Sequence, residues 1–138
     1  ACSAAMMKER VNTAPELFLV AVDKENGRIA GFLNGLATNE ERLRDAFFQD
    51  AKLYDPIGKN IMLLGLDVLP QYRRQGLASE LMFQYQQREA KKGRKTLILT
   101  CLEEKVKMYE KMGFQNCGIS ESSWGGEQWY EMRCELKD

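Results

Sequence analysis

The most informative absence from this chain of 138 residues is histidine, of which the sequence has none. A Cys-His nucleophilic pair is therefore impossible, and a zinc site of mixed cysteine and histidine ligands cannot form. Four cysteines are present, and they are too far apart for a Cys-x-x-Cys motif: Cys2, Cys101, Cys117 and Cys134. Since the last three lie in apolar segments, we expect unlinked thiols in the core and no bound metal.

An excess of charge of one sign is also lacking, because 20 basic residues balance 20 acidic ones. The overall charge therefore favours neither nucleic acid nor an anionic membrane as a partner. No apolar run approaches the roughly 20 residues that span a bilayer, and the start lacks the pattern of a signal peptide. With 44% hydrophobic residues, the chain is long enough to bury one core. We expect a single cytoplasmic domain over residues 1–138.

In the first half of the chain, the pattern predicts a hairpin followed by a helix. Two strand-like segments, 17–23 and 28–37, flank Asn26-Gly27, a pair that tolerates the positive φ of a tight turn. Thr38 and Glu41 then have capping-box spacing, which predicts a helix of about 10 to 15 residues before Asp55-Pro56. Residues 1–12, ahead of the hairpin, suffice for one short helix.

In the second half, strands and helices alternate. Residues 60–69 form a near-continuous apolar run, typical of a central strand covered on both faces. Helical spacing of apolar residues from Leu77 predicts a helix that ends at Gly93, and residues 96–101 predict a buried strand that follows by a parallel crossover. The remaining predicted elements are a helix (103–112) and two strands (114–120 and 128–136).

Between the central strand and the helix lies Arg73-x-x-Gly76-x-Ala78, a sequence suited to an anion. The first amides of a helix have no intrahelical partner and lie at the positive end of its dipole. Gly76 and Ala78 leave room for a diphosphate, and Arg73 and Arg74 add positive charge. The glycine-rich sequences of P-loop and dinucleotide-binding proteins are absent. The alternative interpretation is an ordinary solvated start of a helix.

This segment resembles the acyl-CoA signature, Arg/Gln-x-x-Gly-x-Gly/Ala, of the GNAT superfamily of N-acetyltransferases. A second block, the strand 96–101 followed by Tyr109-Glu-Lys-Met-Gly-Phe114, is similar to the superfamily's fifth strand and the helix after it. Glu41-Arg-Leu, the spacing of Cys101 and Tyr109, and the terminal strand 131–136 resemble the arylalkylamine (serotonin-type) enzymes within the superfamily.

The resemblance implies an α/β fold with a central mixed sheet, splayed between the superfamily's fourth and fifth strands, and helices on both faces. The superfamily's usual first strand and helix are missing from this chain, as expected of a fragment or of a disordered N-terminus. Acetyl-CoA is the implied cosubstrate, with pantetheine in the splay and the diphosphate on the turn after it. The implied cofactor-binding residues are Leu66, Asp67, Val68, Arg73, Arg74, Gln75, Gly76, Leu77, Ala78 and Ser79.

Tyr109 is the implied catalytic acid, which would protonate the departing thiolate, while Val68 N–H is a candidate donor to the oxyanion. Spacing alone favours an aromatic residue packed on the sheet as the interpretation of Tyr109, and the match to the second block reverses that preference. The general base is not identified, because Met62 and Leu64 stand where serotonin-type relatives have histidines. Glu103 or a chain of water molecules would have to take the proton of the amine.

The function that follows from the resemblance is acetyl transfer to a primary amine of a small molecule, with arylalkylamines and polyamine-like amines as the candidate classes. Trp124 and Trp129 could stack on an aromatic amine or could anchor a loop. Two alternatives remain, which are acetylation of a protein lysine or N-terminus, and a non-catalytic acyl-CoA-binding module. A small-molecule partner is expected, and both a monomer and a homodimer are compatible with the sequence.

Overall fold

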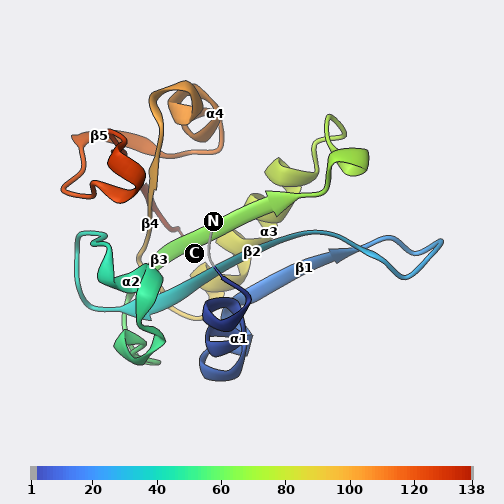
Figure 1. The fold of residues 1–138 in the computed structure, drawn as a ribbon, viewed down its shortest axis with the longest axis horizontal. Helices are drawn as coiled ribbons and strands as arrows, with labels where there is room; N and C mark the ends of the chain where they lie inside the picture. The colour runs from blue at the N-terminus through green and yellow to red at the C-terminus, as the bar shows by residue number, and fades with distance from the viewer. Residues whose placement is uncertain (1–2, 138) are drawn as a thin grey trace.

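A computed structural model describes residues 3–137, which form a six-stranded mixed sheet in the order β1-β2-β3-β4-β6-β5 (Figure 1). The strands are β1 (Phe18–Val22), β2 (Ile29–Thr38), β3 (Asn60–Val68), β4 (Thr96–Cys101), β5 (Gln115–Ile119) and β6 (Tyr130–Glu135). The helices are α1 (Ala4–Thr13), α2 (Ala46–Gln49), α3 (Leu77–Lys91) and α4 (Val106–Lys111). One face of the sheet carries α3, while α1 and α2 lie on the other (Figure 1). The α/β fold with helices on both faces is therefore confirmed.

The predicted hairpin is present, although its turn differs in detail. β1 and β2 pair antiparallel from Phe18 opposite Asn34 to Val22 opposite Ile29. Gly27 has a positive φ of 71°, whereas Asn26 does not and instead accepts a hydrogen bond from Arg28 N through its side-chain oxygen. One left-handed residue therefore suffices for this turn.

The prediction of a helix of about 10 to 15 residues after Thr38 is wrong. Thr38 is the last residue of β2, and its hydroxyl accepts a hydrogen bond from the nearby Glu40 N instead of capping a helix. Leu43 N donates to the side chain of Glu131 on β6, so a tertiary contact satisfies that amide. Only α2 and a single 3-10 turn (Ala51–Leu53) form in this region. Local capping chemistry is overridden by packing against the sheet.

β3, α3 and β4 form the predicted parallel crossover, and the core lies on both faces of its strands. Leu97 and Ile98 of β4 pair with Ile61 and Met62 of β3, and all four side chains have no exposed surface. α3 ends as the sequence predicts, with Gly93 just beyond it at φ 85°. Among residues 3–137, no helix has both the length and the apolar character needed to cross a membrane.

The C-terminal end of α3 is fastened by a buried carboxylate. Glu89 has no exposed surface, and its oxygens lie 3.1 Å from Arg88 Nε, 3.2 Å from Lys92 Nζ and 3.2 Å from Arg94 Nε. Arg94 also donates to the carbonyl groups of Pro56 and Gly58, in the loop that leads into β3. This ion cluster therefore joins the helix to the strand that precedes it.

We expect Glu89→Ala to destabilise the fold by about 3 kcal/mol or more, because it leaves the almost buried Arg94 guanidinium without its counter-charge. Glu40→Ala is the matched control, since Glu40 and Arg44 form an exposed pair and its removal should cost far less. Urea unfolding of both variants and of Glu89→Gln measures the difference. Equal midpoints for Glu89→Ala and Glu40→Ala would contradict a structural role for the cluster.

Candidate active site

The candidate site begins where β3 and β4 separate. Their pairing is limited to Asn60 with Thr96, Ile61 with Leu97 and Met62 with Ile98, and the rest of β3 runs away from β4 (Figure 1). β4 remains paired with β6 along its whole length, so β3 is the strand that bends. The pairing of β3 with β2 moves from Gly35 opposite Leu63 to Asn34 opposite Gly65, which leaves Leu64 as an extra residue. A bulge of this kind bends a strand, so it accounts for the separation.

Beyond the bulge, successive residues of β3 direct their main-chain N–H and C=O groups to opposite edges of the strand. Asp67 lies opposite Phe32, and Leu69 N donates to Ala30 O at 2.9 Å, so the main-chain groups of Asp67 and Leu69 point toward β2. Leu66 and Val68 consequently direct theirs to the opposite edge, from which β4 has departed. Of the three β3 residues expected to bind pantetheine, this geometry commits the main chain of Asp67 to the sheet. It leaves Leu66 and the N–H of Val68 available, while Val68 O accepts from Arg73 Nε.

The turn after β3 presents the N-terminus of α3 without a side-chain cap. The first bond of the helix runs from Glu80 N to Gly76 O at 3.0 Å, so the amides of Leu77, Ala78 and Ser79 precede any intrahelical partner. Gly76 has φ 78°, and nothing lies within 4 Å of the point where a Cβ would stand. This turn therefore has the free amides and the open approach that an anion needs.

The two arginines of the turn have different roles. Arg73 Nε donates to Val68 O at 2.9 Å, which ties the turn to the end of β3. Arg74 is exposed and takes a left-handed φ of 64°, unusual for a residue other than glycine. Arg73 therefore fixes the position of the turn, while Arg74 is left to offer its charge to a ligand.

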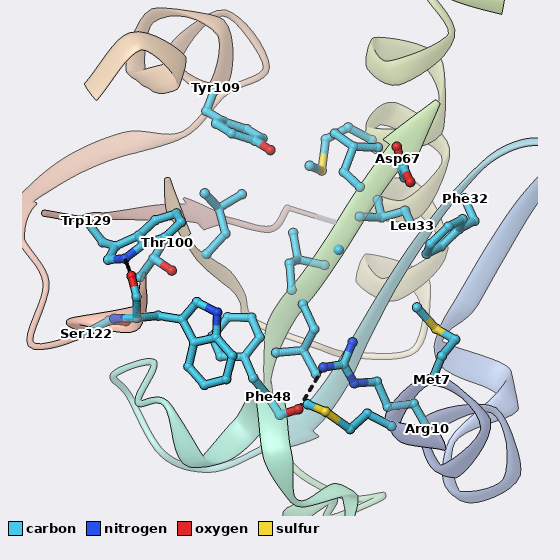
Figure 2. A pocket seen from close by; sticks show the side chains of 18 residues that line it. Met7, Arg10, Phe32, Leu33, Phe48, Asp67, Thr100, Tyr109, Ser122 and Trp129 are labelled. Atoms are coloured by element: carbon cyan, nitrogen blue, oxygen red, sulfur yellow. Dashed lines mark hydrogen bonds between the residues drawn. The ribbon is translucent and has the colours of Figure 1, made fainter. Parts of the chain in front are cut away.

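Tyr109 projects from α4 into a cavity of about 420 Å³ between the separated strands (Figure 2). Its ring packs edge-on against Phe114 at 5.8 Å, and its hydroxyl has no hydrogen-bond partner within residues 3–137. Burial, with a smaller contribution from nearby Cys101, raises the pKa of Tyr109 to about 12. The hydroxyl therefore stays protonated at every physiological pH.

Side chains from segments far apart in the sequence complete the cavity wall. Phe48 of α2 and Trp124 lie with ring centroids 6.1 Å apart, and Trp129 Nε1 donates to Trp124 O at 2.8 Å. Both tryptophans therefore line the cavity and also anchor the loop before β6. Five further lining residues belong to no sequence motif, so the sequence did not indicate them: Arg10, Phe32, Phe48, Thr100 and Ser122.

The alternative proton acceptors considered from the sequence are not brought to the cavity. Glu103 is exposed at the start of a 3-10 turn (Glu103–Lys105) and is not among the lining residues. Met62 is fully buried in the core, whereas Leu64 lines the cavity as the extra residue of the bulge. Within residues 3–137, no cluster of three or more potential ligands could hold a metal ion.

Comparison with known proteins identifies the family. A family model described as "Acetyltransferase (GNAT) domain" matches residues 1–136. The chain belongs to the GNAT acetyltransferase family. It is 30% identical over 114 residues to serotonin N-acetyltransferase of Mesocricetus auratus, in a match that covers 82% of this chain and 54% of that protein. The chain thus spans about half the length of this relative. The expected resemblance to serotonin-type enzymes is confirmed.

Solved structures support the same fold. The GphF GNAT-like decarboxylase in complex with isobutyryl-CoA superposes with a TM-score of 0.77 at 19% identity, covering 99% of this chain and 86% of that one. The ribosomal-protein-S18-alanine N-acetyltransferase of Escherichia coli gives 0.64 at 21% identity, covering 95% and 77%. These likenesses establish the GNAT fold and leave the acceptor open.

The cysteines of this GNAT domain differ from expectation in one respect. Cys101 and Cys134 are buried free thiols, but Cys117 is exposed on β5, which forms an edge of the sheet. Its assignment to the core was therefore wrong, because an edge strand that packs little apolar surface can turn a small hydrophobic residue outward. Cys2 lies outside the described residues.

We expect iodoacetamide to alkylate Cys117 well before Cys101 and Cys134 in the folded protein. Burial raises the pKa of Cys101 to about 11 and also raises the pKa values of Cys134 and Cys117. The order therefore follows from access, since Cys101 and Cys134 are buried and Cys117 is exposed. Timed alkylation followed by peptide mass spectrometry gives the order, and denatured protein serves as the control. Labelling of Cys101 as fast as Cys117 would contradict the burial described here.

Proposed function

We propose that residues 1–138 form one catalytic domain that transfers an acetyl group from acetyl-CoA directly to a primary amine of a small molecule. The observation that carries this proposal is the cavity between β3 and β4, bordered by unpaired main chain on one side and the Tyr109 hydroxyl on the other. The uncapped N-terminus of α3 lies directly beyond the end of β3. An acyl donor with an amide-rich arm and a diphosphate would use all three features.

The residues present fit acetyl-CoA, which supplies a thioester as activated acyl donor. Leu66 and Val68 would bind the amides of the pantetheine arm through main chain that β4 leaves unpaired. Gln75 to Ser79 would hold the diphosphate through free amides, and Arg74 would add a charge-assisted contact. Arg73 would act indirectly, by holding the turn against Val68. Val68 N–H, or Leu66 N–H deeper in the cavity, would stabilise the oxyanion.

In this proposal Tyr109 assists departure of the thiolate. A pKa of about 12 makes the phenol a weak proton source beside a thiol, whose ordinary pKa is about 8.5. The hydroxyl would therefore contribute mainly a hydrogen bond to the sulfur as negative charge develops there. The proton that finally reaches the sulfur would then come from the attacking amine by way of Tyr109 or water.

The shape of the cavity supports a small acceptor. A volume of about 420 Å³ lies within the range of small-molecule sites, and part of it would be taken by the acyl arm. Phe48, Trp124 and Trp129 offer aromatic faces that suit the flat or alkyl body of an amine. Arylalkylamines, the substrates implied by resemblance to serotonin-type enzymes, fit such a wall.

Acetylation of a protein lysine or N-terminus is the second catalytic candidate, supported by the fold likeness to a ribosomal-protein N-acetyltransferase. A non-catalytic acyl-CoA-binding module is the third. Incubation of acetyl-CoA with panels of small amines and of peptides, monitored by release of free thiol, separates the three. Turnover with small amines supports the proposal, turnover with peptides alone favours the second candidate, and CoA binding without turnover favours the third.

We expect the double variant Arg74→Glu, Gly76→Val to lose measurable CoA binding. The substitution at Arg74 repels the diphosphate, and valine at Gly76 requires a backbone conformation that β-branched residues avoid. Isothermal titration calorimetry with CoA gives the affinity, and Lys52→Glu provides a control with the same change of charge at an exposed site on another segment. Wild-type affinity in the double variant would reject the assignment of the turn.

We expect Tyr109→Phe to lower kcat by about 10²- to 10⁴-fold while CoA affinity changes little, because the ring and its contact with Phe114 remain.

In the wild type, the rate should rise with pH as the amine deprotonates, and fall only as Tyr109 ionises near its pKa of about 12. The variant should lack that fall. Stopped-flow rates from neutral to alkaline pH test this, and an unchanged kcat would show that another group serves the thiolate.

A further inference from the structure

The cavity wall includes one acidic side chain, Asp67, and one basic side chain, Arg10, among the described residues. Asp67 is exposed, and its carboxylate has no hydrogen bond or ion pair with any residue in 3–137. Figure 2 shows Asp67 beside Phe32, at the opposite end of the cavity from Arg10. A carboxylate without a partner among the described residues thus stands at one end of the cavity.

The sheet register puts Asp67 on the same face of the sheet as Phe32. Asp67 lies directly opposite Phe32, and Gly65 directly opposite Asn34, so these four residues share one face of the sheet. A Cβ on Gly65 would come within 3.1 Å of Asn34 Oδ1 and 3.9 Å of a Phe32 ring carbon. A side chain at Gly65 would therefore crowd Asn34, and glycine adds no bulk to the cavity wall beside Asp67.

Arg10 does not offset this charge at the ligand surface. Arg10 is only 3% exposed, and its Nη2 donates to Phe48 O at 2.9 Å. It therefore holds α1 against α2 and presents little surface to a ligand. The charge that an acceptor meets in the cavity is the negative charge of Asp67, which favours a cationic ligand.

The nitrogen that reacts is a poor partner for Asp67. An adjacent carboxylate stabilises an ammonium group and raises its pKa, whereas attack on a thioester requires the neutral amine. A second, non-reacting ammonium group has no such conflict, because it must stay charged to bind. On the basis of the proposed acetyltransferase function, we propose that Asp67 binds a distal ammonium group and that the acceptors of this chain are small diamines.

The test compares each diamine with the monoamine of the same chain length, cadaverine with pentylamine and putrescine with butylamine. Acetylation is followed by thiol release, with kcat and KM determined separately. We expect the wild type to favour the diamine by about tenfold in kcat/KM. Two equivalent amines in one molecule account for a statistical factor of about two, and one partly screened ion pair accounts for the rest. The preference should appear in KM and should weaken at high salt.

Asp67→Asn should reduce the diamine preference to the statistical factor, and Asp67→Glu should retain part of it. Glu25→Gln, which neutralises an exposed carboxylate in the β1–β2 turn, should keep the wild-type ratio. Calorimetry with CoA checks that each variant is folded. A preference retained in Asp67→Asn, or an equal loss with both kinds of amine, would overturn the proposal.

Three wild-type results are also decisive, and they separate this inference from the function on which it rests. Equal acetylation of diamines and monoamines would overturn the role of Asp67 while leaving the small-amine acetyltransferase intact. Acetylation of peptides without turnover of any small amine would overturn both. Acetylation of arylalkylamines far above diamines would likewise overturn the diamine assignment and support the aromatic wall as the main determinant.

Discussion

The candidate site depends on the loss of hydrogen bonding between β3 and β4 beyond Met62 and Ile98. A central strand normally satisfies its main chain on both edges, and a strand that leaves its neighbour must find other partners for those groups. The bulge at Leu64 bends β3 while β2 continues to hold its other edge. The result is a cavity bordered by a strand edge whose main-chain groups have no partner on β4.

The crossover from β3 to β4 supports this opening at both ends of α3. At the N-terminus, Arg73 ties the turn before the helix to Val68 at the end of the unpaired edge. At the C-terminus, the buried Glu89 cluster joins the helix to the loop before β3. Because the helix is fixed at both ends, the uncapped turn and the strand edge keep one relative position.

Much of the fold could be predicted because local sequence and tertiary packing agree. The apolar run of β3, the helical spacing of α3 and the glycines after the helices each specify one local structure, and each is present. The helix expected after Thr38 failed because a capping-box pattern is a weak local preference, which contacts such as Leu43 N with Glu131 override. The exposure of Cys117 could not be predicted, since it depends on which strand lies at the edge of the sheet.

For the candidate site, the sequence alone determined the chemistry available: a turn rich in free amides and positive charge, a tyrosine at a defined spacing, and no histidine to serve as a base. These features lie within short segments, where spacing fixes geometry. Tertiary structure decided what surrounds them. It brought Phe48, Trp124 and Trp129 to one cavity, buried the Tyr109 phenol enough to raise its pKa, and placed Asp67 in the cavity wall on the same face as Phe32. Such properties arise from contacts between distant segments and from the exclusion of water, and no local pattern encodes them.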